Sequence, residues 1–276
     1  MVKILAITNQ KGGVGKTTTS INLAASLAAA RRRVLLIDLD PQANATMGSG
    51  VDKRDLQQTV YQVLLGSRSI ADVRVTSTSG RYDLIPANRD LAGAEIEMVD
   101  LPQRETRLKE ALCEIQNEYD FILIDCPPAL NLLTLNGLCA AEAVMIPMQC
   151  EYYALEGLSD LVNTIKKVRS HLNPGLEIEG LLRTMFDPRN ILAQQVSDQL
   201  QQHFGDKVYR TVIPRNVRLA EAPSFGQPAL YHDKLSKGTQ AYLALAGEML
   251  NRHGPGMEAA AQQDFERGLK ASVFKE

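Results

Sequence analysis

The sequence predicts an α/β protein with a doubly wound, mostly parallel sheet that is flanked by helices. Two observations lead to this fold class. Short, nearly continuous apolar segments alternate with stretches of helical periodicity along almost the whole chain, which is typical of parallel strands buried on both faces. A glycine-rich segment also joins the first apolar run directly to the first helical stretch, as in folds that bind phosphate at a strand-to-helix turn.

The predicted elements follow one another in regular order. The strands are expected at Lys3–Thr8, Val34–Ile37, Tyr82–Ile85, Phe121–Ile124, Ala143–Pro147, Glu177–Leu182 and Lys207–Ile213. The helices are expected at Lys16–Ala30, Glu105–Asn117, Leu155–His171, Ile191–His203 and Ser236–Asn251. No fixed-period repeat is present, so a solenoid or propeller is excluded.

Two stretches lack this clear pattern. Asn44–Gly80 is polar and weakly patterned, which leaves the topology there open. The chain after Gly254–Gly256 is rich in Ala, Gln and Glu. We therefore expect one domain over residues 1–253 and a tail over 254–276 that is either a loosely attached helix or disordered. A chain of 276 residues is within the range of a single α/β domain.

Composition excludes several classes of protein. No apolar run reaches the ~18 residues that a membrane span needs, and the first apolar run continues into a glycine-rich turn without a cleavage site. The four cysteines contain no C-x-x-C pair, which argues against a zinc site or a disulfide framework. We expect a cytoplasmic protein. The net charge of −2 means that any binding of nucleic acid must come from a local patch.

The strongest motif lies between the first strand and the first helix. It reads Lys11-Gly12-Gly13-Val14-Gly15-Lys16-Thr17-Thr18. Glycines let successive backbone N–H groups converge on phosphate oxygens, and the following helix N-terminus adds partial positive charge. Lys16 should therefore reach the β- and γ-phosphates, and the Thr17 hydroxyl should ligate Mg²⁺. Gln10 stands where the strict pattern requires glycine, and Lys11 is an added lysine.

This variant loop resembles the deviant Walker A motif of the ParA/MinD superfamily of P-loop ATPases. The resemblance implies ATP and Mg²⁺ as cofactors, slow ATP hydrolysis, and a homodimer that closes around two nucleotides. In that family the extra lysine contacts the nucleotide of the partner subunit, a role that the resemblance gives to Lys11. A cation that completes the site only when two subunits meet would couple ATP binding to dimerisation.

Acidic residues follow two of the predicted strands. Asp38 and Asp40 end the second strand, and Asp125 ends the strand at Phe121–Ile124. The carboxyl ends of parallel strands meet at the ligand-binding edge of such a sheet. Asp125 resembles the Walker B aspartate that holds the Mg²⁺ shell, and Asp40 resembles the switch aspartate that orients the attacking water. The resemblance thus implies a metal site made by Thr17, Asp40 and Asp125. The alternative for Asp40 is a carboxylate that caps a turn. Asp38 is expected to be structural, and Cys126 to be a small apolar filler.

The resemblance extends over roughly Val2 to Leu250 and is closest to chromosomal ParA/Soj proteins. It implies that Pro214 and Asn216 contact the adenine base, with Thr184 and Met185 as further candidates; the alternative is an ordinary Pro-Asn turn. It also implies nonspecific DNA binding by Arg189 and Arg218, while Arg215, Lys234 and Lys237 could extend the patch. The alternative for each of these cations is a solvated surface charge. No base-reading motif is visible, so the expected contacts are to phosphates of double-stranded DNA.

The family resemblance implies a nucleoid-associated ATPase that drives chromosome or plasmid partitioning, stimulated by a ParB-type centromere-binding protein. Three alternatives stay open at this point. A MinD-like membrane-cycling ATPase would need a basic amphipathic C-terminal helix, but in the tail acidic residues match the basic ones. An iron–sulfur reductase would need bridging cysteines, and neither Cys126 nor Cys150 has that setting. A metabolic ligase or kinase of the same fold, such as a dethiobiotin synthetase, would need a second substrate pocket.

Overall fold

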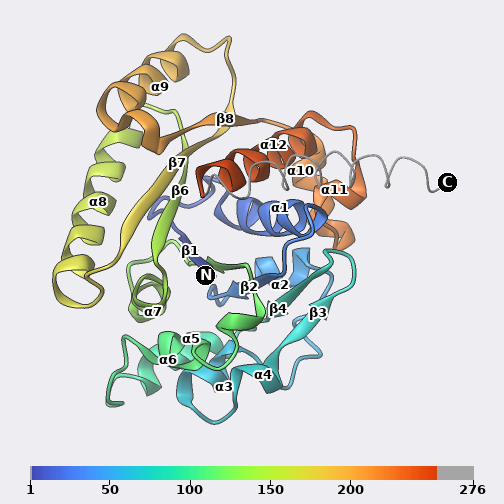
Figure 1. Ribbon diagram of the computed structural model, residues 1–276, viewed down its shortest axis with the longest axis vertical. Helices are drawn as coiled ribbons and strands as arrows, with labels where there is room; N and C mark the ends of the chain where they lie inside the picture. Colours follow the sequence, from blue (N-terminus) through green and yellow to red (C-terminus); the bar gives the residue numbers. More distant parts are fainter. Residues whose placement is uncertain (1, 254–276) are drawn as a thin grey trace.

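The computed structural model describes residues 2–253, and the segment predicted as a tail, 254–276, lies outside them. In the described part, eight strands form one sheet in the order β3-β4-β2-β5-β1-β6-β7-β8 (Figure 1). They are β1 (Lys3–Ile7), β2 (Val34–Asp38), β3 (Val75–Ser77), β4 (Tyr82–Ile85), β5 (Phe121–Asp125), β6 (Ala143–Gln149), β7 (Glu177–Phe186) and β8 (Val208–Pro214). Every neighbouring pair is parallel except β3 with β4. The predicted fold class is confirmed.

Helices cover both faces of the sheet (Figure 1). One face is packed by α1 (Lys16–Ala29), α2 (Asn44–Gly48), α10 (Val217–Glu221), η3 (Ala222–Phe225), α11 (Ala229–His232) and α12 (Lys237–Arg252). The other is packed by α3 (Val60–Leu65), α4 (Ile70–Val73), α5 (Leu91–Glu97), α6 (Arg107–Leu112), α7 (Leu132–Ala140), α8 (Ala154–His171) and α9 (Ile191–Phe204). Short 3₁₀ turns, η1 (Gln116–Glu118) and η2 (Gly205–Lys207), precede β5 and β8.

The two faces explain why the strands read as continuous apolar runs. In β1, Ile4 and Ala6 belong to one core cluster, whereas Leu5 and Ile7 belong to the other. Successive side chains of a strand point to opposite faces, so a strand covered on both sides must be apolar at every position. None of the helices in residues 2–253 combines the length and the apolar character needed to cross a bilayer.

The differences from the predicted elements have physical causes. Helix α7 was not predicted because its apolar residues are spread around its circumference and therefore show no amphipathic period. The helix predicted at Glu105–Asn117 is shorter, since α6 ends at Leu112 and only the 3₁₀ turn η1 follows. The stretch Asn44–Gly80 contains short helices and the three-residue edge strand β3, all too short to produce a periodic pattern.

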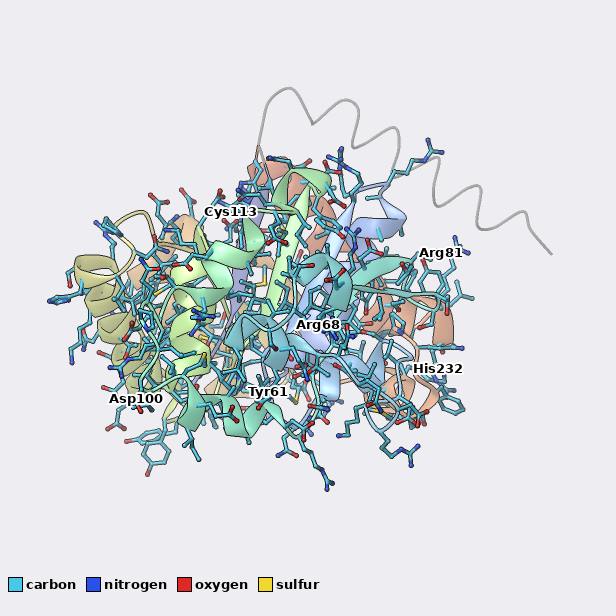
Figure 2. The ribbon with its side chains drawn as sticks, turned by 90° about the horizontal axis from the view of Figure 1, so that it is seen from below. Tyr61, Arg68, Arg81, Asp100, Cys113 and His232 are labelled. Atoms are coloured by element: carbon cyan, nitrogen blue, oxygen red, sulfur yellow. The ribbon has the colours of Figure 1, made fainter. Side chains whose placement is uncertain are left out.

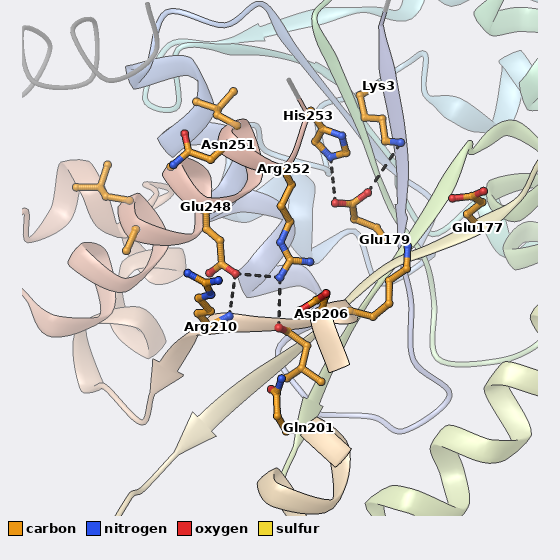
Figure 3. Close-up of a pocket in the computed structure, with 16 residues that line it drawn as sticks. Lys3, Glu177, Glu179, Gln201, Asp206, Arg210, Glu248, Asn251, Arg252 and His253 are labelled. Carbon is orange, nitrogen blue, oxygen red and sulfur yellow. Dashed lines mark hydrogen bonds and ion pairs between the residues drawn. The ribbon is translucent and has the colours of Figure 1, made fainter. Parts of the chain in front are cut away.

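A cavity of about 920 Å³ lies near the amino ends of β1, β7 and β8, beside the last turns of α12 (Figure 3). The charged side chains that line this cavity mostly form hydrogen bonds and ion pairs within the protein. The buried Glu179 accepts hydrogen bonds from Tyr209 and contacts His253 at 3.0 Å and Lys3 at 3.9 Å. Both carboxylate oxygens of Glu248 accept backbone N–H groups at the edge of β8, from Arg210 and Thr211, each at 2.8 Å. This cavity is therefore part of the packing at the end of the sheet opposite the predicted phosphate loop.

Strand register brings the predicted acidic residues to the same edge of the sheet. Asp125 is paired with Ile7 of β1 on one side and with Asp38 of β2 on the other. The predicted phosphate loop begins just after Ile7, so the Lys16 ammonium and the Thr17 hydroxyl lie close to the Asp125 carboxylate. We call the loop Lys11–Thr18 together with Asp40 and Asp125 the phosphate edge.

Candidate active site at the carboxyl ends of the strands

The loop at the phosphate edge is shaped by its own backbone and by the side chain of Asn9, just before it. Gly13 and Gly15 adopt positive φ angles of 74° and 86°, which favour glycine. A Cβ atom added at Gly12 or Gly13 would meet nothing within 4 Å, so the loop borders open space. The Asn9 side chain ties the start of the loop to β6, because its Oδ1 accepts from Lys11 N and its Nδ2 donates to Pro147 O.

Lys16 is buried at the centre of this loop, with 7% of its surface exposed. Its Nζ donates to the backbone oxygen of Lys11 at 3.1 Å. Burial lowers the pKa of Lys16 below its ordinary value, while the neighbouring charges of Asp125 and Asp40 act in the opposite direction. An ammonium group held by one neutral carbonyl can exchange that contact for an anionic oxygen, so the site suits a phosphate.

Asp125 and Thr17 form the part of the site that fits a divalent cation. The Thr17 hydroxyl donates to one Asp125 oxygen at 2.8 Å, and the Ser20 hydroxyl donates to the other at 2.8 Å. Burial raises the pKa of Asp125 to about 7, with a further contribution from the charge of Asp38. Hard oxygen donors that lie this close, with excess negative charge, match the preference of Mg²⁺. A cation there would pull the pKa of Asp125 down again.

Asp40 and Asp38 stand at the end of β2 and differ in setting. Asp40 is half-buried, and one of its oxygens accepts from Gln42 N at 2.9 Å. Asp38 is fully buried, and its oxygens accept from Asp40 N, Thr46 N and the Thr46 hydroxyl. Burial raises the pKa of Asp38 to about 6. Asp38 is thus a structural carboxylate, as expected, whereas Asp40 keeps an oxygen for another partner.

Lys11 lies at the rim of the phosphate edge and not inside it. Its side chain is 47% exposed, and its Nζ lies 2.5 Å from Glu151 Oε2, just after β6. An exposed ion pair of this kind contributes only about 0–1 kcal/mol, so Lys11 can readily exchange this partner for another anion. Its predicted role across a dimer remains a prediction.

Comparison with known proteins agrees with this arrangement. A family model described as an AAA domain matches residues 2–178. The sporulation initiation inhibitor protein Soj of Bacillus subtilis (strain 168) is 56% identical over 249 residues, which cover 90% of this chain and 98% of that protein. The chromosome partitioning protein ParA of Caulobacter vibrioides (strain NA1000 / CB15N) is 52% identical over 253 residues, covering 91% and 95%. This chain belongs to the ParA/Soj family of ATPases.

A similar solved structure carries a different name. The cobyrinic acid a,c-diamide synthase from Mycobacterium smegmatis, with bound ADP and magnesium, has a TM-score of 0.81 and 38% identity, and the match covers 94% of this chain and 98% of that one. A metabolic enzyme of the same fold was one of the alternatives that the sequence left open. The ParA/Soj relatives named above are more similar in sequence, at 52% and 56% against 38%.

The residues predicted to contact the adenine base make other contacts within this ParA/Soj protein. The Thr184 hydroxyl donates to Val14 O at 2.7 Å and so supports the phosphate loop from below. Met185 accepts from Gln149 Nε2, and Asn216 Oδ1 accepts from Arg218 N, which caps α10. Pro214 ends β8, opposite Phe186. Base contacts by these four residues remain predictions.

A cavity of about 430 Å³ lies beside the phosphate loop. It is lined by α1, α2 and the segment around η3: Thr17, Thr18, Ile21, Asn22, Asn44, Met47, Ala222, Pro223, Ser224 and Gln227. None of the four residues predicted for the base belongs to this lining. The cavity adjoins the phosphate loop through Thr17 and Thr18, so it offers room for a second part of a ligand.

The cations predicted to touch DNA are at the surface, and two of them pair with local carboxylates. Arg189 is 88% exposed and pairs with Asp187 at 2.8 Å. Arg218 is 53% exposed and lies 2.8 Å from Glu221 and 3.2 Å from Asp233. The same Glu221 lies 3.7 Å from Nε2 of His232, which is labelled in Figure 2. The other predicted cations, Arg215, Lys234 and Lys237, are exposed or half-buried.

Sequence reasoning missed several residues that build the phosphate edge. Asn9 and Ser20 fix the loop and Asp125, and Thr46 fixes Asp38. Ser20 lies four residues after Lys16 on α1, so the helical spacing alone could have placed it on the same face. Thr46 gave no such signal, because its partner lies in the preceding strand and the intervening chain has no regular period.

Proposed function

We propose that this ParA/Soj-family ATPase binds ATP with Mg²⁺ at the phosphate edge and dimerises in that state. The ATP-bound dimer binds double-stranded DNA without sequence preference and drives chromosome or plasmid partitioning. The observation that carries the proposal is the meeting of Lys16, Thr17 and Asp125 at one edge of the sheet, with Asp40 beside them.

The phosphate edge assigns a separate task to each group. Lys16 exchanges its bond with Lys11 O for oxygens of the β- and γ-phosphates, where its charge offsets theirs. Thr17 and Asp125 would hold Mg²⁺, which would neutralise charge that develops on the phosphates during transfer. Asp40 accepts a hydrogen bond from the attacking water and so orients it. The chain thereby catalyses hydrolysis of ATP to ADP and phosphate.

The position of Lys11 supports the proposed dimerisation. Its side chain is at the rim, and within residues 2–253 its ion-pair partner is the exposed carboxylate of Glu151. When two copies face each other, Lys11 leaves Glu151 and contacts the phosphates bound to the partner subunit. The two nucleotides are then shared between both subunits, so the dimer is stable only while the triphosphate persists.

The ATP-bound dimer would bring two sets of surface cations to one DNA duplex. Arg189, Arg215, Arg218, Lys234 and Lys237 are the cations proposed to contact phosphates, which supply most of the affinity in nonspecific binding. A ParB-type centromere-binding protein stimulates hydrolysis and releases the dimer. The protein is then cytoplasmic and associated with the nucleoid.

DNA binding measured with ATP, with ADP and without nucleotide tests this function. We expect tight binding to unrelated duplexes only with ATP and Mg²⁺, and no binding by Lys16→Ala under any condition. The same samples are pelleted with anionic vesicles as a second arm. DNA binding that ignores the nucleotide, or ATP-dependent binding to vesicles in place of DNA, contradicts the proposal.

A further inference from the structure

The segment that carries Asp40 is fastened at both ends to one buried carboxylate. Asp38 is the last residue of β2 and has no exposed surface. Its Oδ1 accepts from Asp40 N at 3.1 Å, and its Oδ2 accepts from Thr46 N at 2.8 Å and from the Thr46 hydroxyl at 2.7 Å. The chain from Asp40 to Thr46 is therefore a loop that closes on Asp38.

The Thr46 hydroxyl connects this loop to the rest of the sheet. It donates to Asp38 and at the same time accepts from Ala87 N at 2.9 Å, in the chain that follows β4. Thr46 has no exposed surface, so water cannot replace either bond. A hydroxyl can donate and accept at once, whereas the isosteric side chain of valine can do neither.

The backbone between Asp40 and Thr46 contains an unfavourable conformation that surrounding contacts must stabilise. Ala43 has a φ of 54°, in the left-handed region that non-glycine residues rarely adopt, and its N–H donates to Asp40 O at 2.8 Å. An unfavourable conformation of this kind persists only where surrounding contacts over-determine it. Outside the Asp38 contacts, Lys53 Nζ also reaches this segment, at Gln42 O, but that contact is exposed.

We propose that Thr46 is a positioning residue for ATP hydrolysis, acting through Asp38 and the strained turn to hold Asp40 toward the phosphate site. It touches neither the nucleotide nor the metal. Loosening this loop leaves Lys16, Thr17 and Asp125 in place, because they belong to α1 and β5. We therefore expect a lower rate of ATP hydrolysis and an unchanged affinity for ATP. This inference rests on the role proposed above for Asp40.

The test compares Thr46→Val with Thr46→Ser in the full chain. Thr46→Val should bind ATP within about twofold of the original chain and hydrolyse it about tenfold more slowly in single turnover, which corresponds to part of the cost of losing the two buried hydrogen bonds of the hydroxyl. Thr46→Ser keeps the hydroxyl and should restore the rate. Lys53→Ala removes the exposed contact to the same segment and should leave the rate unchanged.

A double variant separates positioning from general damage. If Thr46 acts through Asp40, Thr46→Val should slow the original chain but add nothing to Asp40→Asn. Equal slowing in both backgrounds, or an unchanged rate for Thr46→Val, overturns the inference and leaves the role of Asp40 intact. If Asp40→Asn itself hydrolyses ATP normally, the role of Asp40 fails, and this inference fails with it.

Folding is monitored by thermal unfolding of every variant. Should Thr46→Val fail to fold, Thr46→Cys takes its place, because a thiol is a much weaker hydrogen-bond donor than a hydroxyl. We then expect a folded protein with normal ATP affinity and a hydrolysis rate below that of Thr46→Ser. A rate equal to that of Thr46→Ser overturns the inference.

Discussion

The phosphate edge and the exposed arginines handle charge in opposite ways. At the phosphate edge, Lys16 and Asp125 are buried, and neutral donors and acceptors fix their positions. At the surface, Arg189 and Arg218 each lie against carboxylates from nearby residues. The first region is organised before any ligand arrives. In the second, an anionic ligand has to compete with partners that are already bound.

The ionisation of the carboxylates shows the same contrast. Burial raises the pKa of Asp125 to about 7, whereas hydrogen bonds from Arg189 lower the pKa of the exposed Asp187 to about 2. A buried, electron-rich carboxylate gains strongly from a cation, but an exposed and already paired arginine gains little from one more anion. Substitutions should therefore have large effects at the phosphate edge and small, graded effects at the arginines.

The largest effect is expected for Lys16→Ala. It removes the buried cation that offsets the phosphate charge, so ATP affinity measured by calorimetry should fall on the order of 100-fold or more, given the strength of charge-assisted hydrogen bonds. Lys237→Ala removes an exposed lysine and should leave ATP affinity unchanged. Near-normal affinity in Lys16→Ala would show that the nucleotide site lies elsewhere.

A smaller and more selective effect is expected for Lys11→Ala. The variant should bind ATP as a monomer, because Lys11 lies at the rim, but it should not dimerise when ATP is added, as followed by light scattering. Glu151→Gln is the matched control, since it removes the cis partner and leaves the lysine available. ATP-dependent dimerisation of Lys11→Ala as in the original chain would rule out a role in trans.

At the surface, Arg218→Ala should weaken DNA binding and make the affinity for DNA less dependent on salt concentration. Each phosphate neutralised on duplex DNA contributes about −0.9 to the slope of log K against log salt, so two arginines per dimer correspond to about two units. The loss should be equal on unrelated sequences. Arg33→Ala, which removes another surface arginine paired with a carboxylate, Asp120, is the control; an unchanged slope for Arg218→Ala would exclude this arginine.

The smallest effect is expected from a variant that tests whether local carboxylates compete with DNA phosphates for Arg218. Glu221→Gln frees Arg218 from one of its two carboxylates and should tighten DNA binding by up to about fivefold, the range of an exposed ion pair. Glu118→Gln removes the same charge from the partner of Arg74 and corrects for net charge. Equal tightening in both variants would mean that only overall charge matters.

The sequence predicted those parts of the molecule in which the chemistry depends on adjacent residues. The phosphate loop is one example, because each glycine, lysine and threonine acts within one strand-to-helix turn. The strands are another, because burial on both faces leaves a continuous apolar run. Helix α7 was not predicted for a related reason: the apolar residues of Leu132–Ala140 do not gather on one face.

Contacts between distant residues could not be read in advance. The bond from Thr184 to Val14 spans 170 positions, and that from Asn9 to Pro147 spans 138. Neither residue type is unusual in its own segment, so only the folded sheet reveals their roles. The pairing of Arg189 with Asp187 is different, since the two residues are only two positions apart, and the sequence alone could have suggested that this arginine is partly neutralised.

The carboxylate of Glu248 has a consequence for the open side of the sheet. β8 is an edge strand, and unpaired N–H groups on such an edge can recruit a strand from another molecule. Here α12 supplies a carboxylate that occupies the N–H groups of Arg210 and Thr211 together. The sheet is thereby closed to extension at this point, and a foreign strand would have to displace a charged acceptor that is covalently part of the same chain. Helix α12 therefore hinders the pairing of β8 with a strand from another molecule.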